Sequence, residues 1–419
     1  MSSLAFSVLF VGFLVLTLVV RFWLGSRHIR HVQAHRNAVP AEFAEKIPLA
    51  AHQKAADYTV AKTKLGLVSM LVSAALLIGF TLLGGLQWIA VTLFKFTGPG
   101  MVYQLALLAS FAFISAVFDL PFDYYRQFVL EARFGFNKMT LRLYISDMVK
   151  NVLVGIVIGL PLVWVILTLM EKSGDLWWLY AWFVWTGFQL LMLVLYPTVI
   201  APLFNKFTPL QDENLRARIE SLMQRVGFAS KGLFVMDGSK RSAHGNAYFS
   251  GFGAAKRIVF FDTLLARLGP QEIEAVLAHE LGHFKLKHVI KRIAVMFGLS
   301  LAFLALLGYL KSQAWFFTGL GVDPMLLGNN DAMALILFTL VLPVFTFLLS
   351  PLTSITSRKH EFEADAFAAR HTNAQDLVSA LVKLYEDNAS TLTPDPLHSA
   401  FYDSHPPASV RIHHLLASR

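Results

Sequence analysis

The chain has 419 residues, of which 56% are hydrophobic and only 15% are charged. Because soluble domains are about 45–50% apolar and about 25% charged, this composition predicts a polytopic membrane protein. The lack of cysteine excludes disulfides, thiolate metal sites and cysteine nucleophiles. The net charge of +9 is attributed to basic cytoplasmic loops, since no nucleic-acid-binding signature is present.

Seven apolar stretches of about 20 residues or more are long enough to cross a bilayer as helices. They are residues 4–24, 66–94, 101–120, 152–170, 176–203, 289–310 and 333–355. The first lacks a basic start and a small-residue cleavage site, so it is interpreted as a membrane span and not as a removable signal peptide.

Lysine and arginine are distributed unevenly among the connections between these spans. They are frequent in the loops after the first and third spans, in residues 204–288 and in the C-terminal tail. The other connections carry only single lysines at span edges, namely Lys95, Lys172 and Lys311. The positive-inside rule therefore predicts an outside N-terminus and a cytoplasmic C-terminus.

Two water-side segments are long enough to fold, and they suggest a division of the chain into four parts. Residues 1–203 hold the first five spans, 204–288 a cytoplasmic segment, 289–356 the last two spans, and 357–419 a C-terminal cytoplasmic part. Within 204–288, the runs LFVMD and RIVFF predict strands. The expected fold class is a mainly α membrane protein with a small α+β domain on the cytoplasmic face.

The sequence HELGH carries the clearest chemical signal. His279 and His283 lie four residues apart, on one face of a helix predicted to begin near Pro270. Two neutral imidazoles can occupy two positions of a Zn²⁺ tetrahedron. Glu280 lies beside the first ligand and can take a proton from a water that zinc activates. We expect this helix to continue unbroken to Lys291 and into the sixth span.

A catalytic zinc needs a third protein ligand, with its fourth position left open. The run RKHEFEAD follows the seventh span and offers four candidate side chains. Glu361 and Asp365 share a helix face, so one can bind zinc while the other orients a ligand histidine. We favour Glu361, with Glu363 and His360 as alternatives. Glu363 is expected to point elsewhere, and His288 and His360 are expected to be interfacial or solvated.

HELGHFKLKH followed by EFEADAFA resembles the type I CAAX prenyl protease family of integral-membrane zinc endopeptidases. The blocks EARFGFNKMT, YPTVIAPLFNKFTPL, SKRSAHGNAYFSGFGAAKRIVFFDTLL and SHPPASVR extend the resemblance from about Phe122 onward. It implies a zincin-like protease domain that caps a water-filled chamber enclosed by seven helices. Such a chamber would account for an intramembrane polar residue such as Asp119.

The resemblance also implies a role for each residue of the metal site. His279, His283 and Glu361 would bind one Zn²⁺ per chain. Glu280 would be the general base, and Asp365 would support a ligand from behind.

Three residues outside these motifs receive roles only from the resemblance. His405 would help to stabilise the oxyanion. Arg411 would pair with the ligand Glu361. Asn246 would hold substrate backbone beside an edge strand, where a peptide adds by β-augmentation.

The predicted function is zinc-dependent endopeptidase activity at the cytoplasmic membrane face. Its substrates would be prenylated C-terminal CaaX peptides, from which it removes the last three residues, or membrane proteins cleaved in quality control. The lipid bilayer is an expected partner and nucleic acid is not. The tail HHLLASR shows no eukaryotic retrieval signal, which favours a bacterial inner membrane.

Two other interpretations compete with this one. A seven-span transporter or receptor that binds metal in transit should distribute polar residues along several spans, whereas the motifs here cluster at one face. A site-2-type intramembrane protease should bury HExxH in an apolar span, whereas basic residues crowd this motif. They are Lys285, Lys287, Lys291 and Arg292.

Overall fold

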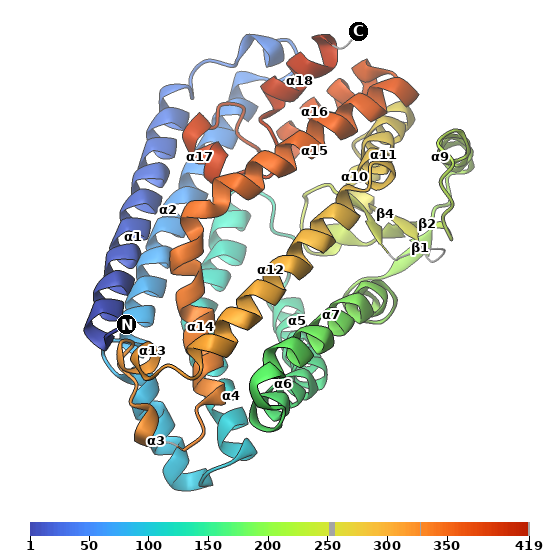
Figure 1. The fold of residues 1–419 in the computed structure, drawn as a ribbon. Helices are drawn as coiled ribbons and strands as arrows, with labels where there is room; N and C mark the ends of the chain where they lie inside the picture. The colour runs from blue at the N-terminus through green and yellow to red at the C-terminus, as the bar shows by residue number, and fades with distance from the viewer. Residues whose placement is uncertain (251–255, 327, 418–419) are drawn as a thin grey trace.

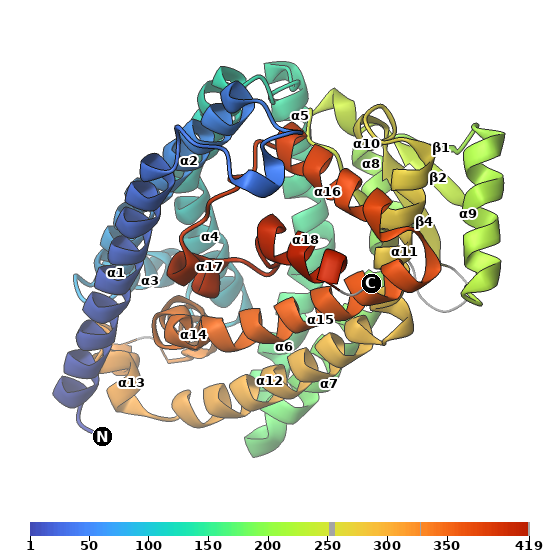
Figure 2. The same cartoon turned by 90° about the horizontal axis from the view of Figure 1, so that it is seen from above.

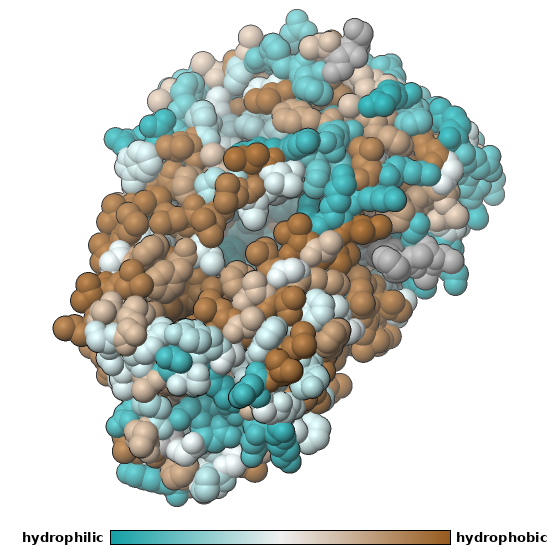
Figure 3. All heavy atoms as spheres, viewed as in Figure 1, coloured by the Kyte–Doolittle hydropathy of each residue, from teal (hydrophilic) through white to brown (hydrophobic). Residues whose placement is uncertain are grey.

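The computed structural model describes residues 1–250, 256–326 and 328–417. Within these residues, seven helices are long and apolar enough to cross a membrane. Figure 3 shows an apolar belt across the middle of the molecule, with polar surface toward both ends. The predicted fold class is therefore confirmed as a mainly helical membrane protein, with a small mixed sheet.

Several of the seven membrane helices continue through a turn of another helix type. Three are single helices, namely α1 (Ser3–Ala34), α2 (Leu49–Phe80) and α12 (His288–Leu310). Four are composite: α4 (Met101–Tyr124) with a π turn, α5 (Leu141–Val154) with α6 (Leu160–Lys172), α7 (Trp177–Leu195) with α8 (Ala201–Phe204), and α14 (Asp331–Thr346) with α15 (Ser350–His371).

The second span differs from its prediction. The expected stretch 66–94 crosses a turn between α2, which ends at Phe80, and a separate helix α3 (Gly85–Thr97). Gly84 in this turn has a left-handed φ of 75°, a conformation that glycine adopts without steric cost. Hydropathy alone does not register such a turn, because all of its residues are apolar or neutral.

The metal-motif helix also differs from its prediction. α11 (Pro270–Lys285) ends before α12 begins at His288, so no continuous helix runs to Lys291. Lys287 between them has a left-handed φ of 59°, which is uncommon for a residue with a side chain. The sequence HFKLKH contains neither glycine nor proline, so it gives no warning of this break.

The water-side segments form a four-stranded sheet packed against helices (Figure 1). The strands are β1 (Phe207–Pro209), β2 (Leu233–Met236), β3 (Ala247–Ser250) and β4 (Arg257–Phe261). Their order is β1-β2-β4-β3, with β2 and β4 parallel and both outer pairs antiparallel. β3 is therefore an edge strand.

The remaining helices lie at the two ends of the molecule. They are α9 (Glu213–Arg225), α10 (Asp262–Leu265), α13 (Ala314–Thr318), α16 (Ala374–Asp387), α17 (Pro396–Tyr402) and α18 (Ala408–Ala417). One apolar core joins the sheet to α9, α11, α16 and α18, with Ile219, Phe260 and Leu281 almost fully buried. This core holds the sheet and these helices together independently of lipid.

The long helices surround a hollow. Figure 2 shows them arranged in a ring with α17 and α18 over its centre, and Figure 3 shows the surface opening inward at the middle of the molecule. Only 6% of the most apolar window of the third and of the fourth span is buried, so both helices have open space or lipid on most sides. Asp119 on α4 is exposed, and its contact with chamber water stays a prediction.

Candidate metal centre

α11 is fixed at its start by one carboxylate of its first turn, that of Glu272. Pro270 occupies the first turn, where its missing N–H costs nothing. The Glu272 carboxylate accepts a hydrogen bond from the Gly269 N–H at 2.7 Å and a second from Lys383 Nζ of α16 at 2.8 Å. This anchoring sets the direction in which the following two turns present their side chains.

α11 crosses α15 at very short range. A Cβ atom on Gly282 would lie 3.0 Å from Cα of Ala364 and 3.1 Å from Cβ of Phe367. The glycine of HELGH therefore permits the backbones of the two helices to approach. This crossing brings the two predicted halves of the metal site together, although two membrane helices separate them in the chain.

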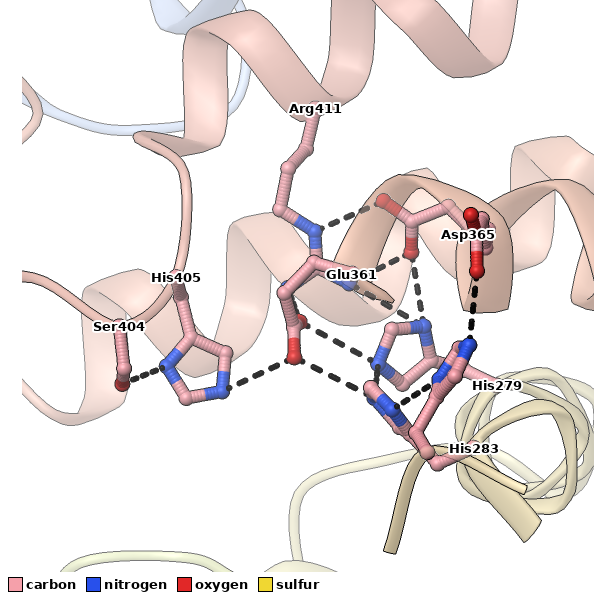
Figure 4. A network of polar contacts seen from close by, with 9 residues as sticks. His279, His283, Glu361, Asp365, Ser404, His405 and Arg411 are labelled. Carbon is pink, nitrogen blue, oxygen red and sulfur yellow. Dashed lines mark hydrogen bonds and ion pairs between the residues drawn. The ribbon is translucent and has the colours of Figure 1, made fainter. Parts of the chain in front are cut away.

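Three predicted ligands converge at this crossing (Figure 4). His279 Nε2 lies 3.3 Å from His283 Nε2 and 3.5 Å from Glu361 Oε2, and His283 Nε2 lies 3.2 Å from Glu361 Oε1. All the candidate ligand atoms lie within 4.8 Å of one another. In the part of the chain that the structure describes, the buried Glu361 Oε2 has no hydrogen-bond partner. Two imidazoles and such a carboxylate fit a Zn²⁺ ion.

Asp365 and Arg411 lie directly behind the first histidine. Asp365 Oδ1 is 2.8 Å from His279 Nδ1, and Arg411 holds the same carboxylate with two hydrogen bonds, of 2.9 and 2.6 Å. The distance from Arg411 Nη1 to Glu361 Oε2 is longer, at 3.5 Å. The expected Arg411–Glu361 pair is therefore a secondary contact, because the guanidinium matches Asp365 in bidentate geometry.

The electrostatic environment of this group favours positive charge. Burial would lower the pKa of His279, but its contacts with the carboxylates of Asp365 and Glu361 outweigh burial and raise the pKa to about 9. Burial would likewise lower the pKa of Arg411, and its hydrogen bonds to Asp365 raise it instead. The negative potential that retains protons on these groups also favours a divalent cation.

Glu280 follows His279 on α11, and His405 lies beside Glu361. Glu280 is half-buried and, among the residues that the structure describes, has no hydrogen-bond or ion-pair partner. His405, in the loop between α17 and α18, directs Nε2 to Glu361 Oε1 at 3.5 Å, and its side chain is 63% exposed. Ser404 Oγ contacts the other ring nitrogen at 3.0 Å. The exposed ring of His405 can therefore meet a substrate.

Asn246 lies immediately before the edge strand β3. Its Oδ1 accepts a hydrogen bond from the Ala247 N–H at 2.8 Å, and its carbonyl accepts one from the Phe261 N–H at 3.0 Å. The structure describes no contact between Asn246 and the metal group. Residues 251–255 of the same sequence block lie outside the described residues.

The sequence interpretation of His288 and His360 is wrong. Both side chains are buried, with 1% and 9% of their surface exposed. His288 contacts His283 at 3.1 Å between Nδ1 atoms and Glu363 Oε2 at 2.8 Å. Their sequence positions gave no signal, because an unbroken helix would place residues 283 and 288 on different faces.

Comparison with known proteins relates the whole chain to membrane proteases. Residues 28–206 match a model of the CAAX prenyl protease N-terminal region with five membrane helices, and residues 209–419 match peptidase family M48. A CAAX prenyl protease 1 homolog from Arabidopsis thaliana is 43% identical, over 74% of this chain and 73% of that protein. CAAX prenyl protease 1 of Saccharomyces cerevisiae is 39% identical, over 74% of this chain and 71% of its own.

The fold is similar as well. The crystal structure of S. mikatae Ste24p superposes with a TM-score of 0.89 at 32% sequence identity, covering 99% of this chain and 100% of that one. The similarity therefore includes both the membrane helices and the four-stranded sheet. The organisms in which these relatives occur are eukaryotes, which gives no support to a bacterial membrane.

We expect Gly282→Ala to weaken both folding and metal retention, because the new methyl group separates α11 from α15. Overpacking of this kind costs about 1–3 kcal/mol. The thermal midpoint and metal content of the purified full-length chain should both fall. Gly12→Ala is the matched control, since nothing lies within 4 Å of a Cβ at that helical position. Unchanged values for Gly282→Ala would show that the crossing does not depend on glycine.

Proposed function

The chain belongs to the CAAX prenyl protease 1 family of integral-membrane M48 zinc metalloproteases, and we propose that His279, His283 and Glu361 hold one zinc ion per chain for peptide-bond cleavage. The observation that carries the proposal is the convergence of these three ligand atoms. The half-buried Glu280, next in sequence to His279, has no partner among the residues that the structure describes. Zinc bound there would supply a Lewis acid that polarises the scissile carbonyl and acidifies water.

The other residues of the site would act on the substrate and on the ligands. Glu280 takes the proton of the attacking water and passes it to the leaving amine. His405, on the open side of Glu361, donates a hydrogen bond to the oxyanion as charge develops on it. Asp365 fixes the ring of His279, and Arg411 neutralises Asp365 so that the carboxylates do not repel one another.

We propose that the peptide lies along β3. This strand is an edge of the sheet, so its outward N–H and C=O groups are available to an extended chain. Asn246 at its start would bind substrate backbone and fix the register.

The substrate class follows from the family. Relatives named CAAX prenyl protease 1 imply prenylated proteins as substrates, and we propose removal of the C-terminal tripeptide from a CaaX sequence. Quality-control cleavage of membrane proteins is the second use that an enclosed site next to lipid would permit. A transporter or receptor without protease activity is not retained, because both family models describe proteases.

Orientation and location are part of the proposal. The distribution of lysine and arginine supports an outside N-terminus, with the metal centre and the C-terminus in the cytoplasm. We also propose the four-part division of the chain into residues 1–203, 204–288, 289–356 and 357–419. Its three boundaries fall inside α8, α12 and α15. The bacterial inner membrane stays a prediction from sequence.

Glu280→Gln should abolish proteolysis without loss of metal, because the amide cannot take a proton. We expect cleavage of a farnesylated CaaX peptide by the purified chain to fall by at least about 100-fold. An unmodified peptide assayed in parallel tests the substrate class, since equal rates on both would favour quality control. Equal turnover by the wild type and Glu280→Gln would sink the catalytic assignment.

Glu361→Ala should lose zinc, because only two protein ligands remain. Elemental analysis should find about one zinc per chain in the wild type and a small fraction of that in the variant. Glu220→Ala, at an exposed carboxylate paired with Arg216, is the control for surface charge. Full retention of zinc in Glu361→Ala would move the third ligand to Glu363 or His360.

The absence of cysteine makes the orientation directly measurable. Lys240→Cys lies in the cytoplasmic part and Ser312→Cys lies at the opposite end of α12, and both positions are exposed. In intact cells, a membrane-impermeant maleimide should label only Ser312→Cys. Labelling of Lys240→Cys alone would reverse the proposed orientation.

A further inference from the structure

The two metal-binding histidines differ in the residue that contacts the ring nitrogen facing away from the metal site. Each directs Nε2 to the metal group, so that Nδ1 faces outward. For His279, the outward nitrogen meets Asp365 at 2.8 Å. For His283, the outward nitrogen meets another imidazole, His288, at 3.1 Å. A ligand histidine needs a partner on its outer nitrogen, because this partner fixes the ring and its tautomer.

The contact with His288 continues to a carboxylate. His288 is buried, and its Nε2 lies 2.8 Å from Glu363 Oε2. Both nitrogens of the His288 ring are therefore engaged, one by the ligand His283 and one by Glu363. A carboxylate thus stands behind each metal histidine, directly for His279 and through one imidazole for His283.

In the series His283–His288–Glu363, the nitrogens that carry hydrogen are determined by the metal at one end and the carboxylate at the other. If Nε2 of His283 binds metal through its lone pair, Nδ1 carries the hydrogen and donates it to Nδ1 of His288. His288 then carries its own hydrogen on Nε2 and donates it to the Glu363 carboxylate. We propose that His288 and Glu363 are positioning residues that hold His283 in the orientation and tautomer required for zinc binding.

The break between α11 and α12 makes this contact available. Five residues of uninterrupted α-helix turn a side chain by about 140°, which would direct residue 288 away from residue 283. The left-handed Lys287 restarts the helix at His288 and turns the imidazole back to His283. The unusual backbone at Lys287 is thereby explained by the needs of the metal site.

A second metal ion is the competing interpretation of the same residues. His288, His360 and Glu363 offer ligand atoms within 4.8 Å of one another. However, the rings of His288 and His360 stack at 4.0 Å with an interplanar angle of 9°. Lone pairs of parallel rings do not converge on one ion, and both nitrogens of His288 already have partners. The hydrogen-bonded series therefore accounts for more of the geometry.

The positioning role of His288 and Glu363 rests on the proposed zinc site. Its test measures metal binding in the absence of substrate. A negative result for this role is therefore distinguishable from a loss of proteolysis. Apparent zinc affinity of the purified full-length chain is measured by chelator competition, with the visible spectrum of the cobalt-substituted chain as a second readout. His288→Leu and Glu363→Ala should weaken zinc binding by about 10- to 100-fold and alter the cobalt bands.

Conservative variants separate positioning from packing. His288→Gln offers an acceptor and a donor at comparable positions, so it should restore most of the affinity lost in His288→Leu. His360→Phe keeps the ring stack and should bind zinc as the wild type does. Glu363→Ala, with its carboxylate near the surface, provides the result if His288→Leu does not fold.

Three results would overturn the proposal. One is wild-type zinc affinity and cobalt bands in both His288→Leu and Glu363→Ala. Another is an equal loss in His288→Gln and His288→Leu, which would indicate packing alone. The last is two zinc ions per wild-type chain that become one in His360→Phe, which would assign a second metal site to these residues.

Discussion

The site depends on the close crossing of α11 and α15. Ligands from two helices can share one ion only if the backbones come within a narrow range, and Gly282 against Ala364 provides that approach. The membrane helices α12 and α14 connect these two helices in the chain. The packing of the membrane helices α12 and α14 therefore determines whether the metal ligands of α11 and α15 come together.

The carboxylates near that crossing are matched by groups that can carry positive charge. α15 contributes Glu361, Glu363 and Asp365 from residues 361–365. Their shortest ion pairs are formed with His283, His288 and Arg411, respectively. Arg411 from α18 neutralises the most buried of the three, and the metal would compensate Glu361. The C-terminal helix thus takes part in the site although it supplies no metal ligand.

The sequence was sufficient for the chemistry and for the number of spans. HELGH and EFEAD identify the ligands because the i, i+4 spacing on a helix is a local property, and hydropathy identifies spans because lipid contact is a bulk property. The sequence was insufficient for features of backbone conformation, burial and pairing that depend on tertiary contacts. The turn at Gly84, the left-handed Lys287 and the burial of His288 are fixed by packing between distant segments, as is the preference of Arg411 for Asp365.

The order of the ligands along the chain has a consequence for biosynthesis. His279 and His283 emerge from the ribosome before the last two spans, whereas Glu361 follows them. A nascent chain with five or six inserted spans therefore holds only two of the three ligands. The protease becomes competent only after its last helix has entered the membrane and returned to meet α11, so the topology itself delays activity until the hollow that confines it is complete.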